Sequence, residues 1–406
     1  MTTQQKQKEK NCKSDFEIEC DENMNIVCYT DTDDNSITCL STLSIMCHTT
    51  VICNGNNGNN GNNGNNSGNS GNSDTGNNGD WDYLDIDFEI KNAIKYNKPI
   101  CDKLHMIICI SNPCQYMRRY RLAKDFKERM EKENDVILYI VELVYDLPGK
   151  IPQKHYITDS DNPRHLQLST KTSPLWHKEN MWNLGVALLP SDWKCVAFCD
   201  ADISFENPHF AQDTLKVLNG SRDIVQMYSH CLDLNANLDA MSIFSSFGYQ
   251  FSNNRKYTRA GLNFWHPGYN VAMTREAYDK LNGLYAYSIL GSGDHNLFLC
   301  LLGNGASSLA NNISDGYKSS ILEYENKCKG LRIGYVNGII KHYFHGTKKN
   351  RQYSERWKIL VKHQYDPNKH IKTDCQGLLV PSEECPKELL DDIILYFETR
   401  NEDELV

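Results

Sequence analysis

Two aspartates separated by one residue, Asp200 and Asp202, have the clearest chemical potential in this sequence. They follow the apolar run Cys195 to Cys199, which is typical of a strand buried on both faces. If the strand continues, side chains two positions apart point the same way. Converged carboxylates repel each other unless a cation lies between them, and hard divalent cations prefer such oxygens and leave positions open for phosphate. The pattern predicts a metal–phosphate site, although an isolated Asp-x-Asp is also typical of a surface turn.

The segments around this pair predict an α/β fold. Apolar runs at 105–110 and 136–145 flank an amphipathic helical pattern at 120–133, which indicates a strand–helix–strand unit and a parallel sheet. A short strand at 165–169 and a helix at 176–189 come next along the chain. In open α/β sheets, ligands bind beyond the carboxyl ends of the strands. The two aspartates therefore fall where a ligand is expected.

The remainder of the chain predicts further helices and strands in a less regular order, and residues 245–263 show no period. The expected elements are a helix ending at 217, a strand at 224–229, a helix within 269–281, a Gly-rich loop leading into a helix at 288–303, a short strand within 335–344, and a helix after the basic loop at 345–351.

Composition narrows the class of protein. Of 406 residues, 40% are hydrophobic, which supports a substantial core, and the net charge of −9 argues against a nucleic-acid partner. Sixteen cysteines include several in apolar runs and no Cys-x-x-Cys pair, so we expect free thiols in a reducing compartment. The polar N-terminus is unlike a signal peptide, and no run approaches the roughly 20 apolar residues of a membrane helix. We therefore expect a cytoplasmic protein with no integral membrane segment.

Four regions are expected along the chain. Residues 1–53 are polar and cysteine-bearing and receive no assigned role. Residues 54–81 are rich in Gly and Asn, lack apolar surface, and are expected to form a flexible linker. A catalytic domain is predicted at 82–366, followed by a tail at 367–406 with one helix at 388–397.

Taken in order, these motifs resemble a known family. A strand–helix–strand unit, Asp200-Ala-Asp202, a Gly-rich acidic loop at 291–296 and the late His345 resemble nucleotide-sugar glycosyltransferases of the GT-A fold. Inverting galactosyltransferase-like and family-2-like enzymes are most similar, over roughly residues 100–365. Similar sequences occur in bacteria and giant viruses, which would also allow a host cytoplasm or a virion. The resemblance implies a Rossmann-like, mostly parallel central sheet flanked by helices, in a single catalytic domain with a flexible N-terminal extension.

The resemblance implies a metal site. Asp200 and Asp202 match the family's Asp-x-Asp motif, and His345 matches a late metal-binding histidine, with His342 as its rival. A metal there bridges the two donor phosphates and acts as a Lewis acid on the departing diphosphate. Mixed carboxylate and imidazole ligation suits Mn²⁺ or Mg²⁺, and the imidazole favours Mn²⁺. The plain alternative is a histidine that merely lies in a loop.

Asp294 matches the position of the family's catalytic base, in Gly-Ser-Gly-Asp-His-Asn. An acceptor hydroxyl must lose its proton as it attacks the anomeric carbon, and a positioned carboxylate can accept that proton. Gly293 and Asn296 depart from the family's acidic positions, which leaves acceptor binding open. The alternative role for Asp294 is a helix N-cap, and the two roles are compatible.

The remaining candidates are assigned to the donor. They are Arg119, Lys178, Asn183, Asp200, Trp265, Gly268, Lys348 and Arg351. A flat aromatic such as Trp265 can stack on a sugar, and Gly268 lets the backbone approach the donor; core packing is the alternative for Trp265. Lys178 and Asn183 are five apart on one predicted helix, so at most one is expected to reach the donor. The basic residues could equally form solvated faces.

These expectations together predict a metal-dependent glycosyltransferase. It would move a sugar from a nucleotide-diphosphate donor, expected to be UDP-linked, to a hydroxyl of a glycan, protein or lipid, with inversion. The alternatives are a retaining enzyme of the same fold, a nucleotide-sugar hydrolase that uses the same aspartates, and a non-catalytic carbohydrate-binding protein.

Overall fold

The computed structural model describes residues 27–30, 37–40, 103–258, 264–353 and 355–404. The chain divides into two units, Met1–Thr75 and Gly76–Val406. In the first unit, β1 (Val27–Thr30) pairs antiparallel with β2 (Ile37–Leu40). The predicted linker and the first residues of the predicted catalytic domain lie outside the described residues.

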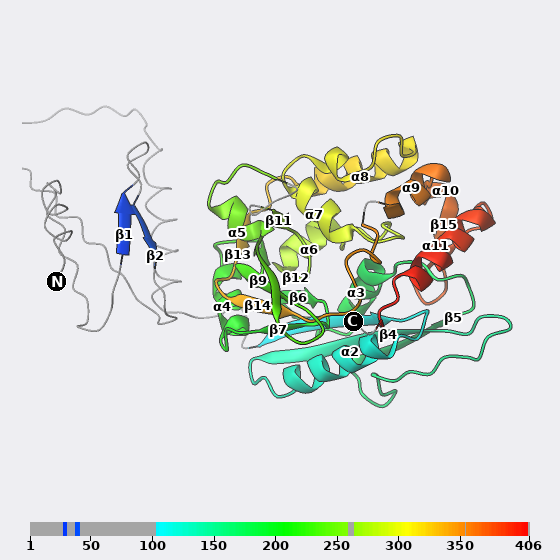
Figure 1. The fold of residues 1–406 in the computed structure, drawn as a ribbon, viewed down its shortest axis with the longest axis horizontal. Coiled ribbons are helices and arrows are strands. Elements are labelled where there is room, and N and C mark those ends of the chain that lie inside the picture. Colours follow the sequence, from blue (N-terminus) through cyan, green and yellow to red (C-terminus); the bar gives the residue numbers. More distant parts are fainter. Residues whose placement is uncertain (1–26, 31–36, 41–102, 259–263, 354, 405–406) are drawn as a thin grey trace, which may run out of the picture. The chain divides into compact units, whose positions relative to one another are not determined.

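A seven-stranded sheet forms the centre of the second unit (Figure 1). Four of its neighbouring pairs are parallel, and only β12 runs antiparallel to its two neighbours. The predicted class, a mostly parallel sheet flanked by helices, is confirmed. The strand order is β13 (Ile333–Tyr335), β8 (Ile224–Gln226), β12 (Asn270–Thr274), β6 (Cys195–Cys199), β3 (Leu104–Ser111), β4 (Val136–Tyr145) and β5 (His165–Thr170).

Both faces of this sheet are covered, which explains the unbroken apolar strands. In β6, Val196 and Phe198 join one core cluster, whereas Cys195, Ala197 and Cys199 join the other. Strand alternation sends successive side chains to opposite faces, so a strand between two cores has no polar positions. The first core packs α3 (Lys178–Val186), α6 (Arg275–Leu281), α7 (Gly293–Leu301) and α8 (Asp315–Cys328), and the second packs α2 (Met117–Met130) and α4 (Phe210–Leu218).

A second sheet brings a late strand beside the aspartate segment. Its order is β11 (Trp265–His266), β10 (Ala240–Ser246), β9 (His230–Leu234), β14 (Ile339–His342) and β7 (Ile203–Phe205). In this sheet, His342 lies opposite Ile203 on one side and Asp233 on the other. The register therefore places His342 beside Ile203, the residue directly after Asp202, although about 140 positions separate them in the sequence. The sequence analysis missed β9, β10, β11 and β12, because these strands are short or lack a clear alternation.

The C-terminal segment corrects a prediction, because residues 367–404 are not a tail with one helix. They form α10 (Pro367–His370), the hairpin of β15 (Ile371–Thr373) and β16 (Leu379–Pro381), and α11 (Lys387–Thr399). Their apolar side chains join the first core, together with those of α9 (Glu355–Lys362). The segment also reaches α2, where both carboxylate oxygens of Asp403 accept hydrogen bonds from the N–H groups of Met117 and Arg118, at 2.8 and 2.7 Å. Within the described residues, no helix combines the length and apolar character of a membrane crossing.

Candidate active site

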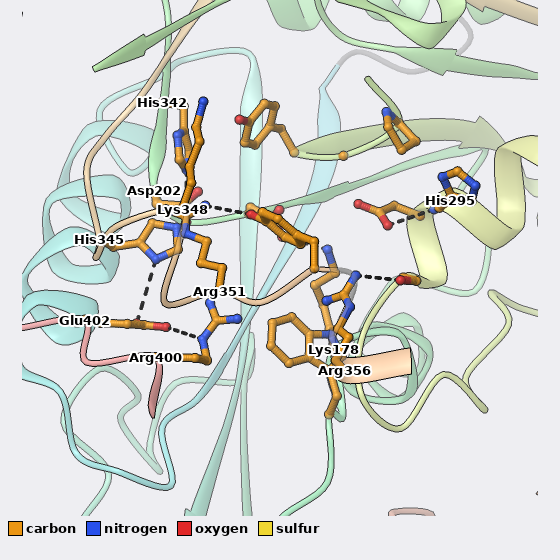
Figure 2. Close-up of a pocket in the computed structure, with 18 of the residues that line it drawn as sticks. Lys178, Asp202, His295, His342, His345, Lys348, Arg351, Arg356, Arg400 and Glu402 are labelled. Carbon is orange, nitrogen blue, oxygen red and sulfur yellow. Dashed lines mark hydrogen bonds and ion pairs between the residues drawn. The ribbon is translucent and has the colours of Figure 1, made fainter. Parts of the chain in front are cut away.

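A cavity of about 850 Å³ lies where strand ends of both sheets meet the start of α7 and the C-terminal segment (Figure 2). Most of the predicted site residues line it: Arg119, Lys178, Asp200, Asp202, Gly268, Asp294, His342, His345, Lys348 and Arg351. Figure 2 shows Asp202, His342 and His345 together on one side, with His295 at the start of α7 on the other. The cavity thus has two chemically distinct ends.

One end gathers Asp202, His342 and His345 into a cluster whose ligand atoms lie within 4.8 Å of one another. Nε2 of His345 lies 3.0 Å from Asp202 Oδ2, and Nε2 of His342 lies 3.9 Å from the same oxygen. The other oxygen, Asp202 Oδ1, is buried and has no hydrogen-bond partner among the described residues. An unpaired buried carboxylate oxygen beside two imidazoles is the arrangement that a divalent cation would satisfy.

Two further carboxylates hold the imidazoles from behind. Asp233 Oδ1 lies 2.7 Å from His342 Nδ1, and Glu402 Oε2 lies 3.9 Å from His345 Nδ1. The hydrogen bond at His342 Nδ1 fixes the tautomer that presents Nε2 to a metal, as is usual for metal-binding histidines, whereas Glu402 is an ion-pair neighbour of His345 at a longer distance. The residues present therefore fit a divalent ion, with one carboxylate and two imidazoles as ligands.

The same contacts keep the carboxylates of this end ionised. Burial would raise the pKa of Asp202, but the neighbouring His345 and His342 hold that pKa well below its usual range. For Asp233, burial is likewise outweighed by hydrogen bonds to His342 and Lys348, and its pKa is also lowered. An ionised carboxylate is the form that binds a cation.

Asp200 lines the same cavity but lies outside this cluster, so the expectation that both aspartates share the metal stays a prediction. Its Oδ1 lies 3.3 Å from the ammonium of Lys178. The strand ends at Cys199 and the chain turns through residues 201–202, so the two-residue alternation that would align the carboxylates does not persist. Burial raises the pKa of Asp200 to about 6, although Lys178 opposes the shift.

Asp294 lies at the other end of the cavity, in the first turn of α7. Its Oδ1 accepts a hydrogen bond of 2.8 Å from the N–H of His295, so it satisfies one free helix amide, while the N-cap position itself is Ser292. A Cβ at Gly268 would lie 2.8 Å from Asp294 Oδ2, so a larger residue there would displace the Asp294 carboxylate. Burial would raise the pKa of Asp294, but Lys178 and His266 outweigh it and the pKa is lowered.

The cationic candidates differ in their partners. Arg119 is held by Glu402, which also pairs with Arg400. Lys348 pairs with Asp233 at 2.6 Å. Arg351 is buried; its Nη1 donates to the Tyr353 hydroxyl at 3.0 Å, and its Nε has no partner among the described residues. Arg351 therefore carries a positive charge without a neighbouring carboxylate bonded to it in the described structure.

Two predicted donor contacts lie elsewhere. The indole of Trp265 packs edge-on against Phe247 and Tyr257 in the first core, with ring centroids 5.0 and 5.4 Å apart. Asn183 exchanges two hydrogen bonds of 2.8 Å with the backbone of Leu284, which ties α3 to the turn after α6. The structure therefore gives both residues structural roles, and of the pair Lys178 and Asn183 only Lys178 lines the cavity.

Several residues of the site escaped the sequence analysis. His266, next to Trp265, lines the cavity, and strand alternation at β11 could have indicated it. No sequence pattern near Asp233 or Glu402 indicated a site. Asp233 lies on β9, a strand that was not predicted, and Glu402 lies in a C-terminal segment whose composition shows only that it is acidic. Their roles depend on contacts between distant parts of the chain.

Comparison with known proteins gives structural likenesses only. No protein-family model and no curated protein matches this chain. Two solved structures of Drosophila β1,4-galactosyltransferase 7 align with it. One is the catalytic domain with xylobiose, at 11% identity, a TM-score of 0.32, and coverage of 72% of this chain and 99% of that one. The other is a mutant with manganese, UDP-Gal and xylobiose, at 10% identity, a TM-score of 0.34, and coverage of 71% and 98%.

A third likeness is the mannosyltransferase PcManGT from Pyrobaculum calidifontis in complex with GDP-Man and Mn²⁺. It has 10% identity and a TM-score of 0.34, and the alignment covers 70% of this chain and 71% of that one. All three are glycosyltransferases. With identities and TM-scores this low, the likenesses do not indicate the chemistry of this chain.

Proposed function

We propose that this protein is a metal-dependent glycosyltransferase that moves a sugar from a nucleotide-diphosphate donor to a hydroxyl acceptor. The observation that carries the proposal is the shared cavity: the cluster of Asp202, His342 and His345 and the ionised Asp294 line the same space of about 850 Å³. That volume is within the range of small-molecule sites. A metal site and a carboxylate base facing one cavity are the parts that a single-displacement sugar transfer requires.

The metal end suits the diphosphate. Asp202, His342 and His345 would hold a divalent ion, which would supply Lewis-acid stabilisation of the leaving diphosphate. Arg351 adds a buried guanidinium whose bonded partner is neutral, so its charge is available to phosphate oxygens. Lys348 and Arg119 are already paired with carboxylates, and they contribute less to the positive potential. We propose a UDP-linked donor with Mn²⁺ or Mg²⁺.

The base end suits the acceptor hydroxyl. Asp294 is ionised because Lys178 and His266 lower its pKa, so it can accept a proton. We propose that it does so as the acceptor oxygen attacks the anomeric carbon. A single displacement by an acceptor on the side opposite the leaving group inverts the anomeric configuration, so we propose inversion. Asp200 orients Lys178 between the two ends of the cavity.

A thermal-shift panel tests this function directly. The purified protein is titrated with UDP- and GDP-sugars in the presence of Mn²⁺, Mg²⁺ or EDTA, and the stabilising donor is then incubated with hydroxyl acceptors. We expect stabilisation that requires the metal, followed by sugar transfer. Stabilisation without a metal would contradict the metal assignment. Release of free sugar, with no transfer to any acceptor, would identify a hydrolase instead.

A further inference from the structure

A second, much smaller cavity of about 20 Å³ lies behind the base. It is lined by Glu179, Asn270, Gly293 and Asp294, among others. Asp294 and Gly268 line both the large and the small cavity. Asp294 therefore stands at the boundary between the site of the acceptor and an internal space on its other side.

Four polar atoms of side chains that line the small cavity lack hydrogen-bond partners in the described structure. They are both carboxylate oxygens of Glu179, Nδ2 of Asn270 and Nε1 of Trp182. Glu179 and Asn270 are each only 3% exposed, and Trp182 is 4% exposed. The Asn270 amide is oriented by the backbone N–H of Met227, which donates to its Oδ1 at 2.7 Å, so Nδ2 remains as the donor at this cavity. Buried polar atoms without partners are rare in folded proteins.

One water molecule in the small cavity would give hydrogen-bond partners to Glu179 and Asn270. A buried water needs roughly 10–15 Å³ and about two to four polar partners. The small cavity has room for one, and Glu179, Asn270 and Asp294 supply the partners. The carboxylate of Glu179 is also held close to the base by tight packing, because a Cβ at Gly293 would lie 2.3 Å from Glu179 Oε1. Gly293 is the residue directly before Asp294.

We propose that Glu179 acts through Asp294: a water in the small cavity joins the two carboxylates and carries the acceptor's proton from Asp294 to Glu179. This inference rests on the proposed function. The acceptor oxygen forms the new bond to the anomeric carbon as its O–H bond breaks, and the bond from that carbon to the diphosphate oxygen breaks, with its electron pair leaving on the diphosphate. Asp294 takes the proton and donates it to the water, which gives another proton to Glu179. Asp294 is then ionised again, Glu179 is neutral, and Glu179 later loses its proton to solvent.

The charges around Glu179 favour this direction of transfer. Burial raises its pKa to about 7, with Lys178 opposing the shift and Asp294 and Asp200 adding to it. Cys109 of β3 and Tyr317 of α8 are the other titratable groups that interact with Glu179. The pKa of Asp294, in contrast, is lowered. A proton that reaches the pair is therefore held more strongly by Glu179 than by Asp294.

The pH dependence of transfer in Glu179→Gln tests the relay. Glu179 must be ionised to receive a proton, so the parent's kcat should rise with pH through a midpoint near 7. In the variant, this limb should disappear and kcat should fall at least about 10-fold, the low side of a proton-transfer contribution, with KM unchanged. The control is Glu142→Gln, since Glu142 is equally buried but binds the backbone of residues 156–158, and it should retain the limb. An unchanged limb in Glu179→Gln overturns the relay.

Two measurements on the full chain remain informative without activity. A high-resolution crystal structure should show a water that is hydrogen-bonded to both Glu179 and Asp294, and infrared spectroscopy should show a protonated carboxyl band that titrates near pH 7 and is lost in Glu179→Gln. A dry cavity overturns the relay even when sugar transfer is measured. Conversely, a water and a titrating band in a protein that transfers no sugar would refute the proposed function and leave the Glu179 site in place.

Discussion

The carboxylates at the metal end all have lowered pKa values, whereas at the base end Asp294 has a lowered pKa and its two neighbours, Asp200 and Glu179, have raised ones. At the metal end, Asp202, Asp233 and Glu402 are each bonded to imidazole or cationic groups, and their pKa values are lowered. At the base end, Glu179 and Asp200 have pKa values raised to about 7 and about 6. Burial acts in the same direction at both ends, so the partners decide the outcome.

The two ends of the cavity differ in the number of cationic and imidazole groups that lie near their carboxylates. The metal end draws two histidines, Lys348, Arg119 and Arg400 against three carboxylates. At the base end, Lys178 faces Asp200, Asp294 and Glu179, and His266 and Arg356 also act on Asp294. The metal end is thus arranged to hold a cation, whereas the base end combines the ionised Asp294 with two carboxylates that hold a proton more readily, Asp200 and Glu179.

Asp202→Asn should abolish the metal response. The amide retains the shape of the side chain but removes the anionic ligand that both imidazoles face. Calorimetry with UDP should show binding that no longer depends on Mn²⁺. The same Mn²⁺ dependence in variant and parent would remove Asp202 from the metal site.

Asp294→Asn should stop transfer without affecting the metal end. An amide oxygen can still accept the hydrogen bond from the His295 N–H, so stability should change by less than about 1 kcal/mol. Transfer should fall about 10²- to 10⁴-fold, the usual contribution of a general base. Melting, donor binding and transfer are measured on one preparation. Normal transfer with lowered stability would make Asp294 only a helix cap, and lost donor binding would place it in the donor pocket.

Glu179→Gln should change how stability depends on pH. The pKa of Glu179 is about 7 in the folded protein and about 4.5 when unfolded, so the unfolded chain binds fewer protons between these values. Stability of the parent should therefore fall as the pH rises from about 4.5 to 7. At pH 8 the variant should be more stable than the parent by up to about 3 kcal/mol, and at pH 4 the two should be similar. Urea denaturation at both pH values checks this, and equal pH slopes would contradict the raised pKa.

Asp233→Asn should weaken the metal site without removing a ligand. The carboxylate of Asp233 lies 2.7 Å from His342 Nδ1 and fixes the orientation of that ring. Loss of such support usually lowers metal affinity about 10- to 100-fold. Mn²⁺ titration measures the change, with Asp315→Asn as the control because the Asp315 side chain is solvent-exposed on α8. Equal Mn²⁺ affinity in both variants would show that the ring is oriented by other contacts.

Deletion of residues 1–80 should have the smallest effect. The segment is polar and rich in Gly and Asn, and the cavity residues described here all come from position 109 onward. Neither the melting temperature nor transfer should change appreciably. A clear drop in the melting temperature would show that the first 53 residues dock on the folded domain.

Features that depend on local sequence patterns could be predicted from the sequence. The strand at 136–145 and the strand at 195–199 have the predicted bounds, because strands covered on both faces carry an unbroken apolar run. Three residues that the sequence analysis selected, Asp202, His345 and Asp294, line the cavity. The sequence analysis gave no role to Asp233, Glu402 or Glu179, since their contacts depend on strand register, on a distant segment and on burial. It expected Asp200 beside Asp202, but a turn, which local alternation does not reveal, separates the two carboxylates.

The contacts between α2 and the C-terminal segment have a consequence for biosynthesis. Asp403 accepts from the first amides of α2, and Glu402 neutralises Arg119 and lies behind His345, although nearly 300 residues separate the two parts of the chain. A nascent chain in which residue 402 is still inside the ribosome has the strands of the sheet but not this carboxylate. We therefore expect the cavity to be completed late, after most of the core has formed. A translation product that stops before residue 400 should fold in part and bind Mn²⁺ poorly.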